Sequence, residues 1–375
     1  FGDIATGFDY GMNAAAKPFD GENKYIRITD IDEASSTYND TDIVSPDGSL
    51  TDNYVVNDRD ILLARTGAST GKSYLYRKSD GKLYYAGFLI RANVTEHNPY
   101  FVFSQLHTHR YWRWVSIMSA RSGQPGINSQ EYSSFPIFTT SLHEENKIAS
   151  LLSRLDERIA TQNKIIEDLK KLKSAIVEML LCNRNSELLK LGDIGYFVRG
   201  LTYANEDVTE NKAATAVIRA NNLNYGNHVD KGEVVYVSRT PATSQILQKG
   251  DIVICMANGS SALVGKNSYY PFNDGQSTVG AFCGIYRTSH PLAKWLMQSR
   301  RYKRLVYQSL QGGNGAIANL NGDDILNMSF PVMEKEKSKS IIFILETIEK
   351  SLAVNKGLQR SYSTQKSHLL KQMFI

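Results

Sequence analysis

The fold is decided by the stretch IASLLSRLDERIATQNKIIEDLKKLKSAIVEML, residues 148–180. Its apolar side chains recur at alternating intervals of four and three residues, and Gln162 is the one polar member of the series from Ile148 to Leu169. This heptad spacing predicts a long helix with a narrow apolar seam, as in a coiled coil. We expect the helix over residues 143–181, with Ser141 as its N-cap. A helix of about 40 residues extends about 60 Å, which is longer than one globular domain needs.

A second long helix is expected over residues 334–375, and it is a copy of the first. Leu152 and Leu345 are 193 residues apart, and the same offset separates Leu155 from Ile348. Neither helix has a wide apolar face, so the simplest arrangement buries the two seams against each other as an antiparallel coiled coil. The alternative is that each helix folds back on its own domain. The seam residues expected to pair are Leu152, Leu155, Ile159, Ile166, Leu345, Ile348 and Leu352.

The segments that precede the helices are also copies of each other. FGDI at residues 1–4 matches LGDI at residues 191–194, and RDILLARTG at residues 59–67 matches GDIVICMANG at residues 250–259. Solenoid repeats are far shorter than this, so a single repeat of such length indicates a duplicated domain. Chance similarity between two unrelated domains is the alternative. We predict a first domain over residues 1–142 and a second over residues 182–333.

Within each domain, short β-branched and aromatic runs alternate with Gly, Asn and Asp, which is typical of strands joined by tight turns. One helix is expected late in each domain, over residues 99–119 and 291–310. This order of elements predicts the α+β class rather than an alternating parallel sheet. The predicted fold is therefore two tandem repeats, each a mixed α/β domain followed by a long helix.

The composition argues against several classes of protein. No stretch reaches the roughly 18 to 20 uncharged apolar residues of a membrane span, and no apolar leader opens the sequence, so we expect a cytoplasmic protein. The three cysteines form no CxxC pair, so neither a disulfide framework nor a zinc site is expected. The net charge of +5 permits nucleic-acid binding without requiring it. Because the sequence begins with Phe1 rather than Met, we expect a short element to precede it.

No catalytic constellation is found in the sequence. GASTGKS at residues 67–73 has three residues between its glycines, where a phosphate-binding loop needs four. HEENK at residues 143–147 is not the HExxH motif of zinc proteases. Asn98-Pro99-Tyr100 has one proline of an NPPY-type methyltransferase motif, and no GxGxx cofactor loop accompanies it. We therefore predict a non-catalytic protein without a cofactor or metal. An enzyme with an unrecognised site is the alternative.

Together these motifs resemble the DNA-specificity (S) subunit of type I restriction-modification systems. The resemblance rests on the duplicated LGDI and DILLARTG-like segments, on a Phe-Pro step at residues 135–136 and 330–331, and on LDERI and NKIIEDLKKLK in the first long helix. It covers essentially the whole chain, and the second long helix is the looser match. A different class, a non-catalytic scaffold whose twin domains bind protein or carbohydrate, is the alternative.

The resemblance implies a division of labour between this chain and its partners. Each domain would be a target-recognition domain that binds one half of an asymmetric, bipartite site in double-stranded DNA. The helices would set the spacing between the half-sites and dock methyltransferase subunits, of which two are expected. A restriction/translocase subunit would join through the complex. Methyl transfer and DNA cleavage would take place in those partners.

We expect DNA contacts from polar residues at strand ends and in Gly-rich loops, because basic, hydroxyl and amide groups suit phosphate oxygens and base edges. The alternative is that these residues face water in tight hairpins. The aromatic and basic stretch from Arg110 to Trp114 is interpreted as core packing with arginines that extend to solvent. The candidate DNA-binding residues are Arg27, Thr29, Arg65, Thr66, Ser69, Thr70, Lys72, Ser122 and Gln124 in the first domain, and Arg219, Asn221, Asn222, Asn258, Ser260, Ser261, Lys266, Arg301, Arg304, Gln311 and Asn314 in the second.

Overall fold

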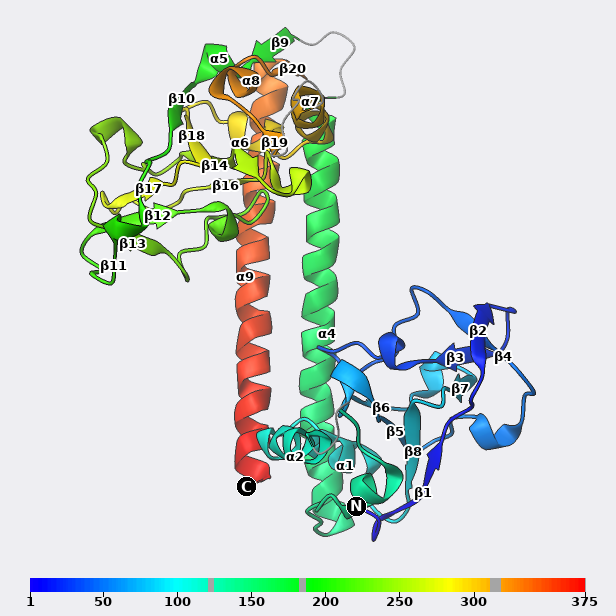
Figure 1. The fold of residues 1–375 in the computed structure, drawn as a ribbon. Coiled ribbons are helices and arrows are strands. Elements are labelled where there is room, and N and C mark those ends of the chain that lie inside the picture. The colour runs from blue at the N-terminus through cyan, green and yellow to red at the C-terminus, as the bar shows by residue number, and fades with distance from the viewer. Residues whose placement is uncertain (121–124, 182–186, 311–317, 375) are drawn as a thin grey trace. The chain divides into compact units, whose positions relative to one another are not determined.

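The computed structural model describes residues 1–120, 125–181, 187–310 and 318–374. The chain forms two compact units, and each is built from one globular domain and parts of two long helices (Figure 1). Unit 1 comprises Phe1–Ile166 and Val354–Ile375, and unit 2 comprises Glu167–Ala353. Unit 1 is therefore completed by a helix segment that is distant from its domain in the sequence, whereas unit 2 is one continuous stretch of the chain.

A four-stranded antiparallel sheet lies at the centre of unit 1. Its strand order is β1-β8-β5-β6, and β5 is buried along its whole length, as its apolar sequence DILLA predicts. Beside it, β3 pairs in parallel with β7, and β2 pairs with β4. The elements before the long helix are β1 (Ala5–Tyr10), β2 (Ala15–Pro18), β3 (Lys24–Ile26), β4 (Val44–Asp47), β5 (Asp60–Ala64), β6 (Ser73–Leu75), β7 (Leu83–Tyr85), β8 (Leu89–Val94), α1 (Pro99–Gln105), α2 (His109–Ser119) and α3 (Ser129–Ser134).

The central sheet of unit 2 has the same topology, with strand order β10-β18-β14-β16. In the neighbouring sheet β12 is parallel to β17, just as β3 is parallel to β7 in unit 1. The elements are β9 (Glu187–Lys190), α5 (Leu191–Ile194), β10 (Tyr196–Arg199), β11 (Val208–Thr209), β12 (Thr215–Ile218), β13 (Val235–Val237), β14 (Ile252–Cys255), β15 (Ala257–Asn258), β16 (Asn267–Tyr269), β17 (Ser277–Val279), β18 (Cys283–Arg287), α6 (Ala293–Leu296), α7 (Arg300–Leu310), β19 (Ala318–Asn319), α8 (Gly322–Leu326) and β20 (Ser329–Val332). The predicted α+β class and repeated architecture are confirmed.

The prediction of one continuous helix late in each domain is wrong. Residues 99–119 form α1 and α2, and residues 291–310 contain α6 and α7. The hydroxyl of Thr108 accepts a hydrogen bond from the backbone N of Tyr111, and the hydroxyl of Ser299 accepts one from the backbone N of Tyr302, each at 3.2 Å. These hydroxyl groups act as N-caps, and an N-cap starts a new helix.

A buried tyrosine fixes the Gly-Lys step of each domain. The hydroxyl of Tyr111 donates to the carbonyl of Gly71 at 2.8 Å, and that of Tyr302 donates to the carbonyl of Gly265 at 3.0 Å. Both glycines have positive φ, and a Cβ would lie 2.8 Å from Val115 at the first and 2.7 Å from Val306 at the second. The glycines are therefore required for the close approach of a helix to the loop.

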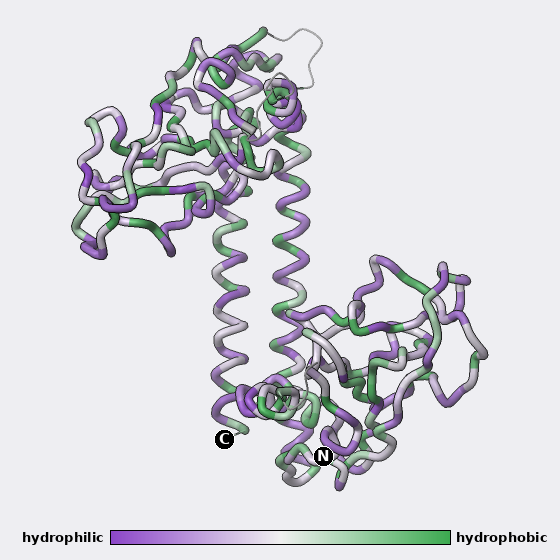
Figure 2. The backbone as a smooth tube through the Cα atoms, in the orientation of Figure 1, coloured by the Kyte–Doolittle hydropathy of each residue, from purple (hydrophilic) through white to green (hydrophobic). Residues whose placement is uncertain are grey.

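The long helices are α4 (Leu142–Met179) and α9 (Lys335–Met373), and segments of both pack together in each unit. In unit 1 Leu152 shares a core with Leu370 and Phe374, and Lys366 forms a 2.6 Å ion pair with Asp156. The N-terminal part of α4 thus contacts the C-terminal part of α9, so these two segments run antiparallel. Figure 2 shows hydrophobic and hydrophilic residues alternating along both helices, as expected of a narrow seam.

In unit 2 the later part of α4 packs against the first part of α9. Val177 and Leu180 share a core with Ile342 and Leu345, and Lys173 pairs with Glu349 at 2.8 Å. This pairing is again antiparallel, and the helix pairing of the predicted fold is thereby confirmed within each unit. Of the predicted seam residues, Ile159 is half-buried and the others are buried.

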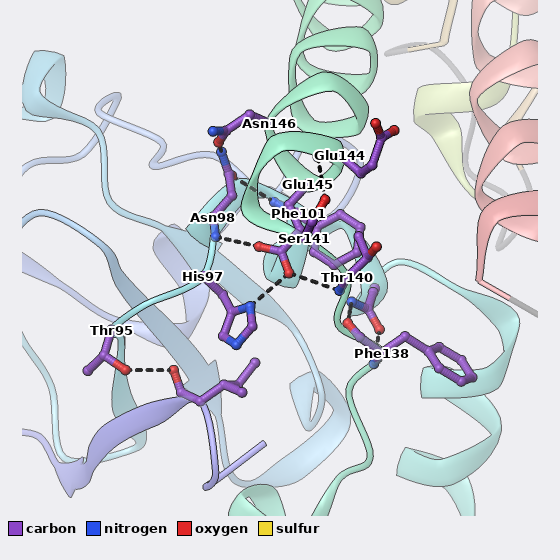
Figure 3. Close-up of polar contacts among 12 residues, drawn as sticks. Thr95, His97, Asn98, Phe101, Phe138, Thr140, Ser141, Glu144, Glu145 and Asn146 are labelled. Carbon is purple, nitrogen blue, oxygen red and sulfur yellow. Dashed lines mark hydrogen bonds and ion pairs between the residues drawn. The ribbon is translucent and has the colours of Figure 1, made fainter.

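A buried carboxylate joins α1 to the start of α4 in unit 1 (Figure 3). Glu145 is completely buried, and its carboxylate accepts hydrogen bonds from the backbone N of Asn98 at 2.8 Å and of Thr140 at 3.3 Å. The Nδ1 atom of His97 lies 2.7 Å from the same carboxylate. In the second repeat Ser338 occupies the corresponding position, and its hydroxyl donates to the carbonyl of Met333 at 3.0 Å. Only the first repeat therefore has a carboxylate at this junction.

We expect Glu145→Ala to lower the free energy of unfolding by about 3 kcal/mol, because it removes a buried carboxylate and leaves two partly buried backbone N–H groups without their acceptor. The matched variant Ser338→Ala removes one hydroxyl donor and should cost about 1 kcal/mol. Chemical denaturation of the full chain measures both values, and hydrogen exchange shows which unit opens. Equal losses in the two variants would contradict this role for Glu145.

Candidate nucleic-acid interface

Three of the predicted DNA-binding residues of the first domain lie together. Arg27 and Thr29 follow β3, Arg65 follows β5, and all three line a hollow of about 580 Å³ in unit 1. Arg65 stacks on the ring of Tyr10, with its Cζ atom 4.6 Å from the ring centroid. The Nε atom of Arg65 is buried and has no hydrogen-bond partner among the described residues. The cationic side chain of Arg65 thus lines this hollow, while its Nε atom is shielded from solvent.

Arg27 is neutralised by a carboxylate of its own loop. It forms two hydrogen bonds to Asp30, at 2.9 Å from Nε and 2.8 Å from Nη2, and this contact raises the pKa of Arg27. In the second domain, Arg219 stands at the corresponding position after β12 and Asn222 replaces Asp30. Arg219 therefore faces a neutral residue at this point, and its buried Nε atom has no partner within the part of the chain that the structure describes.

Asn222 was predicted to bind DNA, and the structure corrects this. Its side chain is only 3% exposed, its Oδ1 atom accepts from the backbone N of Arg219 at 2.9 Å, and its Nδ2 atom donates to the carbonyl of Glu233 at 2.9 Å. Both ends of the amide are used inside the domain, so none is left for a base. Asn221, its neighbour, is exposed.

The loop after β5 contains a second correction. Thr70 is buried, and its hydroxyl donates to the carbonyl of Gly67 at 2.8 Å, so it shapes the turn instead of facing a ligand. Thr66 and Ser69 are half-buried. Lys72 is partly exposed, and its Nζ atom lies 3.4 Å from the exposed carboxylate of Glu33. An exposed ion pair of this kind is weak and leaves the lysine available to an anion.

The corresponding loop of the second domain is more open. Asn258 is half-buried and its side chain accepts from the backbone N of Ser260 at 2.9 Å, while Ser260 and Ser261 are exposed. Lys266 is half-buried, and its carbonyl accepts from the backbone N of Cys255 at 2.8 Å, which holds its backbone to the end of β14. These side chains differ from those of the first loop although the strands beneath them correspond.

The remaining candidates have mixed positions. Arg304 on α7 is exposed, whereas Arg301 donates from Nε to the carbonyl of Ser329 at 2.8 Å and is half-buried. The candidates in the Gly-rich loops, Ser122, Gln124, Gln311 and Asn314, lie outside the described residues.

The predicted core packing of the stretch from Arg110 to Trp114 holds only in part, because Trp112 is 43% exposed. Tyr111 is buried, and the guanidinium of Arg110 lies over the ring of Phe138, with 4.1 Å between its Cζ atom and the ring centroid. Sequence reasoning missed two other aromatic residues, Phe88 and Phe282, which are exposed next to the candidate loops. The sequence shows that Phe88 and Phe282 are equivalent, since they are 194 residues apart, but it does not show that they are exposed.

Two other kinds of site are absent from the described segments. No helix among residues 1–120, 125–181, 187–310 and 318–374 is both long and apolar enough to cross a membrane. Over the same ranges no group of three or more His, Cys, Asp or Glu side chains is arranged to hold a metal ion.

The sequence is similar to known specificity subunits. Residues 10–171 match the family model described as the type I restriction modification DNA specificity domain. The EcoKI specificity subunit of Escherichia coli (strain K12) is 29% identical over 150 residues, which cover 37% of this chain and 31% of that protein. The StySPI specificity subunit of Salmonella potsdam matches with the same identity and coverage. The match thus spans about a third of each of these curated relatives.

Solved structures extend the comparison to the whole chain. The S subunit of a type I restriction-modification system from M. genitalium has a TM-score of 0.65 at 15% identity, over 100% of this chain and 94% of that chain. A chain from a study of complex assembly and conformational transition of the type I R-M system has a TM-score of 0.53 at 13% identity, over 99% of this chain and 95% of that chain. At these identities the two structures establish a shared fold. Residues 10–171 are thus similar to the DNA specificity domain of type I restriction-modification systems, and the chain shares the fold of the two solved structures.

Proposed function

We propose that this chain is the sequence-specific DNA-binding subunit of a type I restriction-modification complex, with one half-site of an asymmetric, bipartite target bound by each domain. The observation that carries the proposal is that the same sheet topology occurs twice while the polar residues after corresponding strands differ. Two domains that share a scaffold dock on DNA in the same way, whereas different side chains select different bases.

The clearest difference between the two binding surfaces is electrostatic. Arg27 is paired with Asp30, whereas Arg219 has the neutral Asn222 at that position. Both loops carry a lysine, Lys72 and Lys266, but the loop after β14 adds the amide of Asn258 where the loop after β5 has hydroxyl groups alone. These contrasts support two half-sites of different sequence.

Exposed apolar residues on the helices support docking of methyltransferase subunits. On α4, Leu172 and Met179 of unit 2 are exposed and seven residues apart, which places them on one face of the helix. On α9, Phe343 and Ile344 of unit 2 are also exposed. Apolar side chains gathered outside a helix seam are typical of protein interfaces. We propose that two methyltransferase subunits dock on the helices and that a restriction/translocase subunit joins through the complex.

In this proposal the chain itself catalyses no reaction. Methyl transfer and cleavage take place in the partner subunits, and the spacing of the half-sites depends on the long helices. We place the complex in the cytoplasm, where its DNA substrate is found.

Replacing Lys72 or Lys266 with Ala should weaken DNA binding and reduce the slope of log K against log salt concentration by about 0.9 for each phosphate that is no longer bound. Gel-shift titration of the full chain over a range of salt concentrations measures this, with and without co-expressed methyltransferase subunits. Lys147→Ala, an exposed lysine paired with Glu144 on α4, is the matched control. Unchanged affinity and slope in both variants would remove these loops from the interface.

A binding selection from random duplexes should return two different half-sites separated by a gap of constant length. Arg219→Ala should relax the preference in one half-site and leave the other unchanged, because each domain binds separately. Sequencing of the selected pools reports both results. A palindrome or a single uninterrupted site would count against the proposal.

Phe343→Asp should reduce the amount of methyltransferase subunit that co-purifies with the chain, because it places a charge in the proposed docking surface. Leu188→Asp, at an equally exposed position on β9, is the control and should leave co-purification unchanged. If Phe343→Asp retains its partner in full, this surface of α9 is not the docking site.

A further inference from the structure

An exposed phenylalanine occupies the same place in both domains. Phe88 immediately precedes β8 and Phe282 immediately precedes β18, and these are corresponding strands of the two central sheets. Their side chains are 62% and 69% exposed. A phenyl ring left in water forgoes the free energy of burial, so its presence at the same exposed position twice in one chain points to a ligand.

The backbone beneath each ring is firmly held. In unit 1 the N of Leu89 donates to the carbonyl of Ala86 at 2.8 Å, and the carbonyl of Phe88 accepts from the N of Arg65 at 3.0 Å. In unit 2 the N of Cys283 donates to the carbonyl of Gly280 at 2.8 Å. There the carbonyl of Phe282 accepts from the N of Met256 at 2.8 Å. Each ring is therefore presented from a fixed turn, and little ordering is needed when it binds.

An arginine also lies near the turn that carries each ring. Phe88 lines the same hollow as Arg27 and Arg65, and Arg65 donates from Nη1 to the carbonyl of Gly87 at 3.4 Å. In unit 2 the Cγ atom of Arg219 lies 3.9 Å from the position that a Cβ on Gly280 would occupy, two residues before Phe282. Arg65 and Arg219 are the arginines whose Nε atoms lack a partner among the described residues.

The combination of an exposed aromatic ring on a well-held turn and a nearby arginine matches the chemistry of DNA. Guanidinium groups bind phosphates and base edges, while an apolar ring can stack on a base or contact the methyl group of thymine. A protein partner would instead be expected to need an extended apolar patch, whereas the hollow beside Phe88 is also lined by Arg27, Thr29 and Arg65.

We propose that Phe88 and Phe282 are base-contacting residues, one for each half-site, and that the apolar contact of each ring with a base adds to the specificity of its domain. This inference rests on the proposed function. It assigns a role in sequence recognition to residues outside the hydrogen-bonding loops, and it gives the two domains a contact in common.

The test is a binding selection from random duplexes with the full chain, assembled with methyltransferase subunits, in the wild type and in Phe88→Ala and Phe282→Ala. Each variant should bind the wild-type target roughly 10-fold more weakly and lose preference in one half-site only. Binding to unrelated duplex at low salt should not change, and neither should the melting temperature, because both rings are exposed. Leu188→Ala, at an equally exposed position on β9, should behave as the wild type.

Two modified targets distinguish the kinds of base contact. If uracil in place of one thymine weakens wild-type binding as much as the Ala variant does, the ring contacts a thymine methyl group. If 2-aminopurine at one position brightens on binding to the wild type but not to the variant, the ring stacks on an unstacked base. Either result supports the inference.

Wild-type affinity and preference in both Ala variants would overturn the inference and leave the proposed function standing. An equal loss on target and unrelated DNA would also overturn it, because the inference assigns the rings to sequence preference and a uniform loss leaves that preference unchanged. Loss of methyltransferase subunits from the variants would assign the rings to a protein interface instead. Failure of the wild-type assembly to bind DNA would overturn the proposed function and the inference together.

Discussion

The structure depends on the narrow apolar seams of α4 and α9. Neither helix can bury its seam alone, so each seam must pack against the other helix. In unit 1 the seam of α4 is covered by the last part of α9, where Leu152 meets Leu370. In unit 2 it is covered by the first part of α9, where Val177 meets Leu345. The core of unit 1 thus joins the two ends of the chain, so it cannot close before the last helix is present. Forming contacts between residues so far apart in the sequence costs much conformational entropy.

Around these seams the same scaffold is built twice from closely similar contacts. A tyrosine hydroxyl from a hydroxyl-capped helix holds the glycine of a Gly-Lys step in each domain, at Gly71 and at Gly265. The carboxylate of Glu145 adds a charged junction in the first repeat, and the second repeat has Ser338 instead. The scaffold is therefore shared, and the polar groups attached to it are individual.

This separation between scaffold and polar surface is what a sequence-specific binder with two half-sites needs. On the proposed function, the strands place a guanidinium, a loop with a lysine and a phenyl ring at corresponding points of both domains. The neighbours of these groups then decide what each can bind: Asp30 neutralises Arg27, whereas Asn222 leaves the charge of Arg219 without a carboxylate. In this proposal the partner subunits carry out methylation and cleavage. These reactions require only that the two domains are placed correctly.

The sequence by itself determined the long helices, the duplication and the α+β class. Heptad spacing and repeated landmarks are local signals, and burial of a helix along one seam requires the heptad spacing directly. It also indicated the core packing around Tyr111.

The tertiary structure alone decided which polar residues remain free. Thr70 and Asn222 carry the right groups for DNA, yet their neighbours bury them and take up their hydrogen bonds. The helix breaks at Thr108 and Ser299 follow from hydroxyl N-caps within an otherwise helical sequence pattern. Phe88 and Phe282 are of a residue type that is usually buried in the core. They are exposed to solvent only because of the turn that holds each of them. Exposure is set by contacts between residues far apart in the chain, which no local pattern contains.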